Sequence, residues 1–284
     1  MFEDIHIFIP TKERLNNQKT YNILKELNLN PILVIEPQEE NEAVERDYDF
    51  IVLPEDNKGI SYSRNYILDY AKNKNFKYIC MIDDDIQFFG EIVPIRKRKK
   101  GNEAFLKALE YFKNSKTCGT MQYNQFAWCQ PKPIVYNRGL EVVMFLYMPL
   151  LQNVYFEEDT IEDRNFSLDI ILNHNVKTFR LNHLYFQTPS IGTNKGGIES
   201  NSRFQKQIEW SQKMEKKWGS DICKYVIKKN GTPDIKINWR NVDKLLDKTV
   251  IQLKFPLYPE SKAFIFDNPP KYEQLQFPFM KDFV

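Results

Sequence analysis

Three consecutive carboxylates, Asp83-Asp84-Asp85, directly follow the apolar run 78–82. A short apolar run bounded by polar residues is typical of a buried strand. Side chains alternate along an extended chain, so we expect Asp83 and Asp85 to point one way and Asp84 the other. Mg²⁺ binds through one or two carboxylates together with substrate phosphates. The spacing therefore predicts a divalent cation at Asp83 and Asp85 that bridges to a nucleotide diphosphate, and an exposed acidic turn is the alternative.

A second candidate for anion binding lies between a predicted strand and a predicted helix. Gly59 is followed by Ser61 and Ser63, and N–H groups at a helix start can bind an anion. Arg64 can fork onto phosphate or pair with Asp83. The alternative is an ordinary helix start with a solvated arginine.

Transfer of a glycosyl or phosphoryl group to a hydroxyl needs a base, and a carboxylate is the usual one. Asp163 is the first candidate and Glu162 the second, although acidic residues in a first helical turn often only complement the helix dipole. His183 is expected in a loop after a strand, as a third metal ligand or as a packed or surface histidine.

Two further segments could contact phosphates. The flexible loop with Lys195, Gly196 and Gly197 could close over a diphosphate, or simply connect two elements. A run of five cations would either contact a polyanion backbone or be a solvated face; it consists of Arg96, Lys97, Arg98, Lys99 and Lys100.

Strands and helices alternate in the first part of the chain. We expect strands at 5–10, 32–35, 50–53 and 78–82, with helices at 20–29 and 61–73. This alternation predicts a mostly parallel sheet covered by helices on both faces, and ligands bind at the carboxyl ends of such strands. The candidate residues follow those ends, so we expect them to converge.

The remaining pattern is more varied. It predicts helices at 103–112, from 162 and at 200–218, and strands at 118–123, 134–136, 141–148, 154–156 and 176–180. Segment 255–284 is rich in proline and aromatic residues and shows little periodicity. We therefore expect one α/β domain over 1–200 and a helical or irregular extension over 201–284.

Composition excludes some classes of protein. The chain has 284 residues with Lys+Arg 40 against Asp+Glu 38, so any nucleic-acid surface must be local. Its four cysteines form no CxxC pair, which is typical of reduced thiols in the cytoplasm, or in the host cytoplasm if the protein is viral. An apolar run of about 20 residues and a signal sequence are both missing, so no membrane partner is expected.

Taken in order, these motifs resemble the GT-A glycosyltransferases, and specifically the TET/JBP-associated DNA glycosyltransferase family. That family includes the base J glucosyltransferase and phage enzymes that add sugars to hydroxymethylated pyrimidines. The likeness covers about residues 5–200. It rests on Ile9-Pro10-Thr11-Lys12 with Arg14, Val34-Ile35-Glu36-Pro37-Gln38, Val52-Leu53-Pro54, Gly59 with Ser63-Arg64-Asn65, Met81 to Ile86, Glu162-Asp163 with Phe166-Ser167-Leu168, and Lys195-Gly196-Gly197.

The resemblance implies a GT-A, Rossmann-like fold and metal-dependent, inverting transfer of a sugar. The donor would be a nucleotide sugar, first of all a UDP-sugar, and the acceptor 5-hydroxymethylcytosine or 5-hydroxymethyluracil in phage DNA. Asp83 and Asp85 would hold Mn²⁺ or Mg²⁺, and Asp163 would be the base. The nucleotide sugar would contact Pro10, Thr11, Lys12, Arg14, Glu36, Arg64, Asp83, Asp84, Lys195, Gly196 and Gly197.

Two departures from the family pattern bear on the sugar and the acceptor contacts. Glu13 stands where relatives often have glycine, and Arg164-Asn165 replaces an acidic residue expected after Glu162-Asp163. Two other functions stay open: the same donor site could serve a glycan, lipid or small-molecule acceptor, or the fold could be a non-catalytic nucleic-acid-binding protein.

Overall fold

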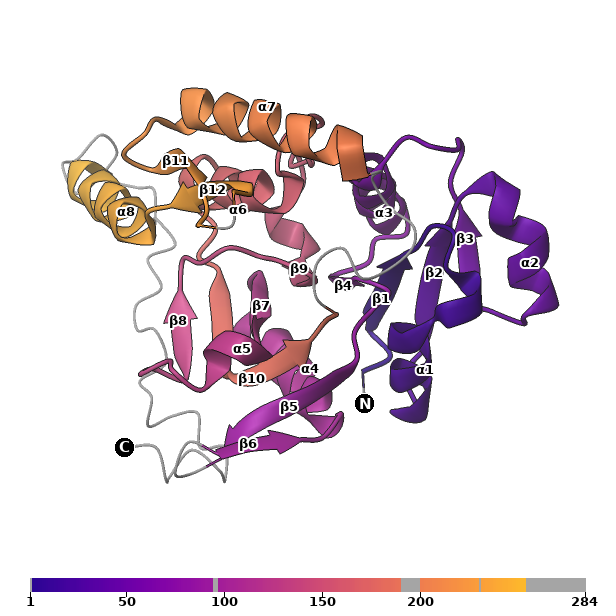
Figure 1. Ribbon diagram of the computed structural model, residues 1–284. Coiled ribbons are helices and arrows are strands. Elements are labelled where there is room, and N and C mark those ends of the chain that lie inside the picture. The colour runs from indigo at the N-terminus through magenta and orange to yellow at the C-terminus, as the bar shows by residue number, and fades with distance from the viewer. Residues whose placement is uncertain (1, 94–96, 190–199, 230, 254–284) are drawn as a thin grey trace.

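The centre of the molecule is a 10-stranded sheet. The computed structural model describes residues 2–93, 97–189, 200–229 and 231–253 (Figure 1). One half of the sheet is parallel, in the order β3 (Phe50–Val52), β2 (Pro31–Ile35), β1 (Ile5–Pro10) and β4 (Tyr78–Ile82). These are the four strands that the sequence predicts, and their carboxyl ends lie at one edge.

The other half of the sheet is mixed. From β4 it continues through β9 (Val143–Tyr147), β7 (Gly119–Tyr123), β10 (Phe179–Gln187), β5 (Phe88–Val93) and β6 (Lys97–Lys100), while β8 (Ile134–Tyr136) pairs with β10. The pairings set β9, β5 and β8 against the direction of the other strands. The sheet is therefore mostly parallel in direction, as predicted.

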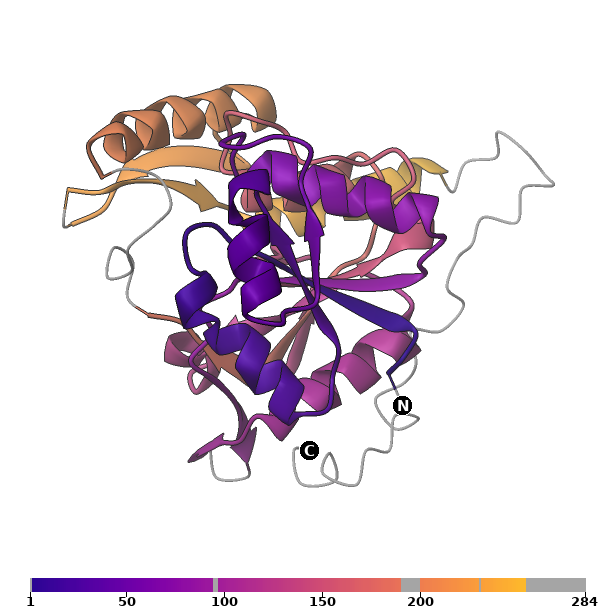
Figure 2. The same ribbon diagram turned by 90° about the vertical axis from the view of Figure 1, so that its right-hand side faces the viewer.

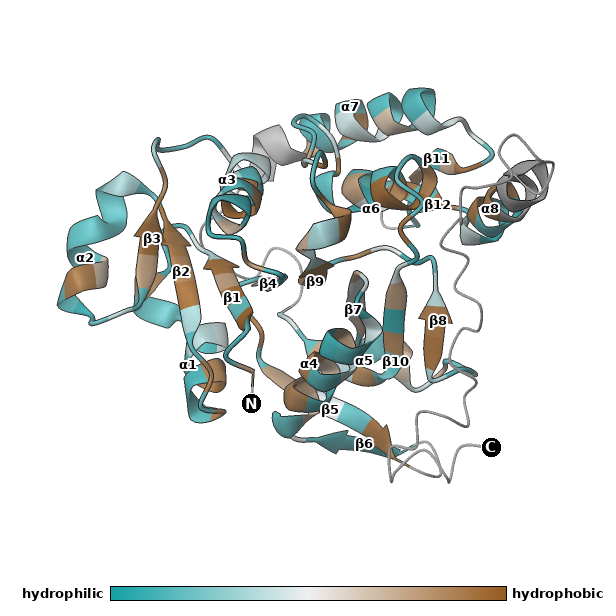
Figure 3. Ribbon diagram, turned by 180° about the vertical axis from the view of Figure 1, so that it is seen from behind, coloured by the Kyte–Doolittle hydropathy of each residue, from teal (hydrophilic) through white to brown (hydrophobic). Residues whose placement is uncertain are grey.

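Helices cover both faces of this sheet (Figure 2). α1 (Lys19–Glu26) and α4 (Glu103–Ser115) pack on one face, and α3 (Ile60–Asn73) and α6 (Glu162–Leu172) on the other. Side chains alternate along a strand. In the central strand β1, Ile7 and Ile9 are therefore buried in the core on the face of α1 and α4, and Phe8 is buried in the core on the face of α3 and α6. Apolar residues follow the strands and polar ones the outer helix faces (Figure 3).

Short helices connect these elements. They are α2 (Glu40–Glu45), α5 (Asn124–Ala127) and three 3-10 turns at Leu15–Asn17, Pro37–Glu39 and Met148–Leu150. Within the described part of the chain, none of the helices combines the length and the apolar composition that crossing a membrane requires. All four cysteines are free thiols.

The C-terminal segment adds a helix, a hairpin and a second helix. α7 (Ser200–Trp218) leads to the antiparallel pair β11 (Cys223–Ile227) and β12 (Pro233–Ile237), and α8 (Trp239–Leu253) follows. Ile222, Cys223 and Ile235 are buried in the same core as Phe8. This segment therefore shares a core with the sheet domain. Segment 255–284 lies outside the described residues.

One predicted strand is wrong and another is displaced along the chain. Residues 154–156 form none; instead the Asn65 side chain donates to the Phe156 carbonyl at 2.9 Å and accepts from the Phe156 amide at 2.7 Å. The side-chain amide of Asn65 thus satisfies both backbone hydrogen-bonding groups of Phe156, as a neighbouring strand would. The strand predicted at 176–180 is β10, which begins at Phe179 and extends to Gln187.

Candidate functional site

The acidic residues after β4 form a tight turn with divided exposure. The side chain of Asp84 is 5% exposed, that of Asp83 37% and that of Asp85 26%. Asp84 is the most buried of the three, but the expectation that Asp83 and Asp85 point the same way is not confirmed. Asp83 lies 3.2 Å from Arg64, whereas Arg14 Nη1 lies 2.7 Å from Asp84 and 3.8 Å from Asp85. The chain turns at Asp84 and Asp85 instead of leaving as an extended strand. Asp83 and Asp85 are therefore the two carboxylates that solvent or a ligand can reach.

Asp84 connects the turn to the loop after β1. Thr11 Oγ1 donates to Asp84 at 2.7 Å, and Arg14 Nη1 lies 2.7 Å from the other carboxylate oxygen. Gln18 Nε2 in turn donates to Thr11 Oγ1 at 2.8 Å. These bonds use the Thr11 hydroxyl and both Asp84 oxygens. We infer that Thr11 and Asp84 position the two loops, and their contact with a nucleotide sugar stays a prediction.

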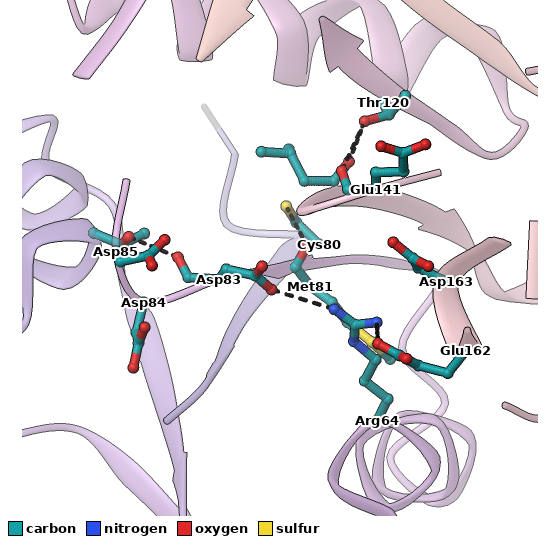
Figure 4. A network of polar contacts seen from close by, with 12 residues as sticks. Arg64, Cys80, Met81, Asp83, Asp84, Asp85, Thr120, Glu141, Glu162 and Asp163 are labelled. Atoms are coloured by element: carbon teal, nitrogen blue, oxygen red, sulfur yellow. Dashed lines mark hydrogen bonds and ion pairs between the residues drawn. The ribbon is translucent and has the colours of Figure 1, made fainter. Parts of the chain in front are cut away.

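Arg64 joins the acidic turn to the start of α6. Gly59, with φ 88°, turns the chain into α3, and the guanidinium lies one turn into this helix. Nη2 lies 3.2 Å from Asp83 and Nη1 lies 2.9 Å from Glu162 (Figure 4). The predicted contact between Arg64 and Asp83 is thus confirmed. With 5% of its side chain exposed, Arg64 is a buried cation between two anions.

Crowding of the turn changes the protonation of Asp83. Burial raises the pKa of Asp83 to about 7, Arg64 opposes this, and Asp85 and Asp84 add to it. An anion that is hard to ionise beside other anions is the environment in which a cation relieves most repulsion. Since Asp83 still has 37% of its side chain exposed, that cation can approach from solvent.

A second group of carboxylates faces Arg64 from the other side. Asp163 lies between Glu141 and Glu162 (Figure 4), and Asp163 Oδ1 accepts the Arg164 amide at 2.7 Å. Burial raises the pKa of Glu162, and the Arg64 charge opposes this. Both predicted base candidates therefore lie in the site, with Glu162 engaged by Arg64.

Glu141 is a site residue that the sequence interpretation missed. It was expected only as the first residue of a strand, but its carboxylate lies beside Asp163 and bonds to the Tyr123 hydroxyl. Burial and the Asp163 charge raise the pKa of Glu141, while Arg164 and Arg180 oppose this. A glutamate at the start of an otherwise apolar strand was the available signal.

Lys12 and Glu36 form a third cluster next to the loop after β1. Lys12 Nζ lies 3.1 Å from Glu36 Oε2 and also contacts Asn57. The Glu36 carboxylate accepts the Asn57 amide and the Gln38 side chain, both at 2.9 Å. Because Glu36 is 4% exposed, we infer that it positions Lys12, which is 32% exposed. Pro10 ends β1 and is buried.

Glu13 has the backbone conformation that explains a glycine in relatives. Its φ is 56°, in the left-handed region where a side chain is strained. The Glu13 amide donates to Glu39 Oε1 at 2.8 Å, which holds the loop in this conformation. We infer that a side chain at this position costs local backbone strain.

Metal binding at the acidic turn stays a prediction, and the two accessible carboxylates would supply only part of the ligands. No group of three or more His, Cys, Asp or Glu that could hold a metal exists among the residues for which coordinates are given. Asp83 and Asp85 offer two accessible hard oxygen ligands, and Mg²⁺ or Mn²⁺ can take its remaining ligands from diphosphate and water. We expect the ion to bind together with the nucleotide.

The structure does not support His183 as the third ligand. The residue lies within β10 and not in a loop, is 7% exposed, and its Nδ1 lies 2.9 Å from the Pro133 carbonyl. Burial lowers the pKa of His183, and the nearest ionisable groups are Glu91 and Lys107. His183 is therefore a packed histidine, and the metal expectation for it is wrong.

The remaining predicted contacts lie elsewhere. Lys97, Arg98, Lys99 and Lys100 form the exposed edge strand β6, where lysines discourage pairing with another chain. Lys99 and Lys107 both pair with Glu91. Arg96, Lys195, Gly196 and Gly197 lie outside the described residues. DNA binding by β6 stays a prediction.

Comparisons with known structures give distant likenesses. A crystal structure of A197 from STIV shares 16% identity over 64% of this chain and 83% of that chain, with a TM-score of 0.36. A CMP:2-keto-3-deoxy-manno-octonic acid synthetase complexed with CTP shares 10% identity over 71% and 95%, with a TM-score of 0.40. A cytidylyltransferase from Leptospira borgpetersenii shares 11% identity over 90% and 98%, with a TM-score of 0.34.

Comparison with curated proteins returns no match. The sequence model of one family does match, over residues 5–197, a range that contains the acidic turn, Arg64 and the start of α6. That range is most of the sheet domain and agrees with the resemblance noted from the motifs. The chain belongs to the TET-associated glycosyltransferase family.

Proposed function

We propose that the protein transfers a sugar from a nucleotide diphosphate donor to the hydroxymethyl group of a 5-hydroxymethylpyrimidine in DNA. The observation that carries the proposal is the arrangement of two carboxylate groups about one buried arginine, with Asp83 on one side of Arg64 and Glu162 and Asp163 on the other. Family membership supplies the reaction class. DNA as the acceptor, the UDP-sugar donor and the phage setting are our proposals.

The turn after β4 would hold the donor. Asp83 and Asp85 would hold Mn²⁺ or Mg²⁺, and this ion would act as a Lewis acid that neutralises the departing diphosphate. Lys12, 32% exposed and held by Glu36, and Arg14, held by Asp84, direct their charges toward the same phosphates. Arg64 keeps the Asp83 carboxylate oriented through its 3.2 Å contact.

The start of α6 would hold the base. Asp163 accepts the proton of the acceptor hydroxyl, the hydroxyl oxygen forms a bond to the anomeric carbon, and the bond from that carbon to the diphosphate oxygen breaks. The electron pair leaves with the nucleotide diphosphate, so the leaving group needs no protein acid. One carboxylate is sufficient for such a direct, inverting displacement. Because Glu162 is paired with Arg64, Asp163 is the carboxylate that we assign to the acceptor hydroxyl.

The direct test is transfer itself. DNA that contains 5-hydroxymethylcytosine or 5-hydroxymethyluracil is incubated with Mn²⁺ and a panel of nucleotide sugars, and the digested nucleosides are weighed by mass spectrometry. We expect one hydroxymethylpyrimidine to gain the mass of one sugar, and unmodified DNA to stay unchanged. Transfer to a glycan or lipid acceptor but not to DNA would assign the same site to another acceptor class.

A further inference from the structure

The hairpin of β11 and β12 borders a cavity that is open to solvent and has Glu141 in its wall. This cavity has a volume of about 370 Å³, and its walls include Glu141, Arg164 and Trp239. Glu141 lies beside the proposed base Asp163. The cavity therefore joins Glu141, the neighbour of the proposed base, to a C-terminal segment that the family match at 5–197 does not cover.

One face of the hairpin points toward this cavity. In the register of the hairpin Lys224 is opposite Lys236, and Val226 is opposite Asp234. Directly opposed residues share a face of a sheet. Lys236, Asp234 and Val226 line the cavity, and Lys228 lies on the same face because it is two residues beyond Val226. The other face carries Cys223 and Ile235, which are buried in the core, and Ile235 and Ile237 also border the cavity.

An ion-pair cluster fixes this face against α6. Asp234 Oδ1 accepts Arg164 Nη1 at 2.7 Å, and Asp234 Oδ2 lies 2.7 Å from Lys228 Nζ. The Ile235 carbonyl accepts Arg164 Nη1 as well, at 2.7 Å. The hairpin is thereby held at a defined position beside Glu141, while Lys224 and Lys236 have exposed side chains.

An aromatic ring completes the wall. Trp239 packs so closely on Gly139 that a Cβ added there would lie 3.1 Å from the ring carbon Cζ2. The half-buried indole is therefore fixed in place with part of its surface on the cavity. A fixed aromatic ring beside exposed lysines is the combination that stacks a base and holds its flanking phosphates.

We propose that this cavity is the acceptor subsite and binds one nucleotide of a single strand, or one extruded from a duplex. The base stacks on Trp239, its hydroxymethyl group reaches Asp163 past Glu141, and the flanking phosphates lie on Lys224 and Lys236. This assignment rests on the proposed function, which supplies the reaction at Asp163.

Salt-dependent binding tests the lysine face. The Lys224→Ala/Lys236→Ala variant is compared with Lys19→Ala/Lys77→Ala, which removes two exposed lysines elsewhere. The probe is a fluorescent single-stranded oligonucleotide with one 5-hydroxymethylcytosine, measured by anisotropy over a salt series. We expect about tenfold weaker binding, and a slope of log K against log salt that is shallower by about 1.4, since two single-strand contacts contribute roughly 0.7 each. Slopes that match the control overturn the subsite.

Stacking is tested at Trp239. Trp239→Phe keeps a ring and Trp239→Leu does not, while both keep an apolar side chain against Gly139. We expect Trp239→Leu to raise KM for the oligonucleotide at least fivefold and Trp239→Phe less than twofold, with unchanged affinity for the nucleotide sugar. Equal effects of the two variants on KM contradict stacking.

The two proposals fail in different ways. If the lysine variant weakens oligonucleotide binding but the wild-type protein transfers no sugar to DNA, the cavity is a nucleic-acid site and the proposed reaction is wrong. If the protein glycosylates DNA and the hairpin variants bind and turn over like their control, the reaction stands and the subsite is overturned.

Discussion

Arg64 and Glu162 are separated by 98 positions in the chain, yet Nη1 of the arginine donates to Oε1 of the glutamate at 2.9 Å. The same guanidinium holds Asp83 at 3.2 Å. One buried cation thus sets the distance between the proposed donor site after β4 and the proposed base at the start of α6. The geometry of transfer depends on this residue.

Removing the arginine should therefore affect both stability and activity. Arg64→Ala leaves Asp83 and Glu162 facing each other, and we expect the free energy of unfolding to fall by about 3 kcal/mol, the lower end for a broken buried pair because Asp83 is partly exposed. Arg46→Ala is the control, because the Arg46–Glu42 pair is exposed and should cost about 0.5 kcal/mol or less. Urea unfolding measures both, and similar losses would show that Arg64 is not a structural cation.

The raised pKa of Asp83 gives a pH dependence with a definite sign. Its carboxyl has a pKa of about 7 in the folded protein against 3.8 ordinarily, so the folded state binds the extra proton between these values. The contribution of Asp83 therefore lowers the free energy of unfolding as pH rises from about 4 to 7. Without metal, Asp83→Asn should flatten that fall in urea titrations between pH 5 and 8. Parallel curves for the two proteins would contradict the shift.

Glu13→Gly tests the strained loop. Glycine adopts a φ of 56° without the steric strain of a side chain, but it also raises the entropy of the unfolded state. We expect the strain to be the larger effect, so the free energy of unfolding should rise by up to about 1 kcal/mol. Glu13→Ala keeps the strain and separates this effect from loss of the carboxylate. Equal stability of the glycine and alanine variants would remove strain as the explanation.

The base assignment is tested with two isosteric changes. Asp163→Asn should lower kcat by roughly 10²- to 10⁴-fold with little change in nucleotide-sugar affinity, because it removes only the proton acceptor. Glu141→Gln keeps Asp163 and should lower kcat much less. The reverse order of the two effects would make Glu141 the base, and equal losses in kcat and donor affinity would give Asp163 a binding role.

The parts of the fold that sequence could predict are those with continuous apolar runs or with a helical spacing of apolar residues. Strands β1, β2, β3 and β4 match the prediction, and so does the helix expected at 103–112, which is α4 and buries Phe105, Leu109 and Phe112. β10 was placed too early because polar residues occupy its buried positions. Asn182, for example, is 1% exposed and pairs with Gln122, a partner that no local pattern reveals.

The site shows the same limit. Asp83, Asp85, Arg64 and Asp163 could be proposed because each follows a strand end or starts a helix. For Glu141 the sequence offers only a glutamate at the start of an apolar run, and its role comes from Asp163 and Tyr123, which lie beside it only in the folded sheet. The β11–β12 hairpin had a signal, Gly231 between two alternating runs, that was not used.

The central claim is that the carboxylates after β4 hold a cation for a nucleotide sugar. Calorimetry of UDP-glucose and related donors, with and without Mn²⁺, tests it on the wild type, on Asp85→Asn and on Asp49→Asn, a control with a 61% exposed side chain. We predict that Mn²⁺ tightens donor binding at least tenfold in the wild type and the control, and that Asp85→Asn loses this gain. A donor affinity that changes neither with Mn²⁺ nor with the Asp85→Asn substitution would contradict this claim.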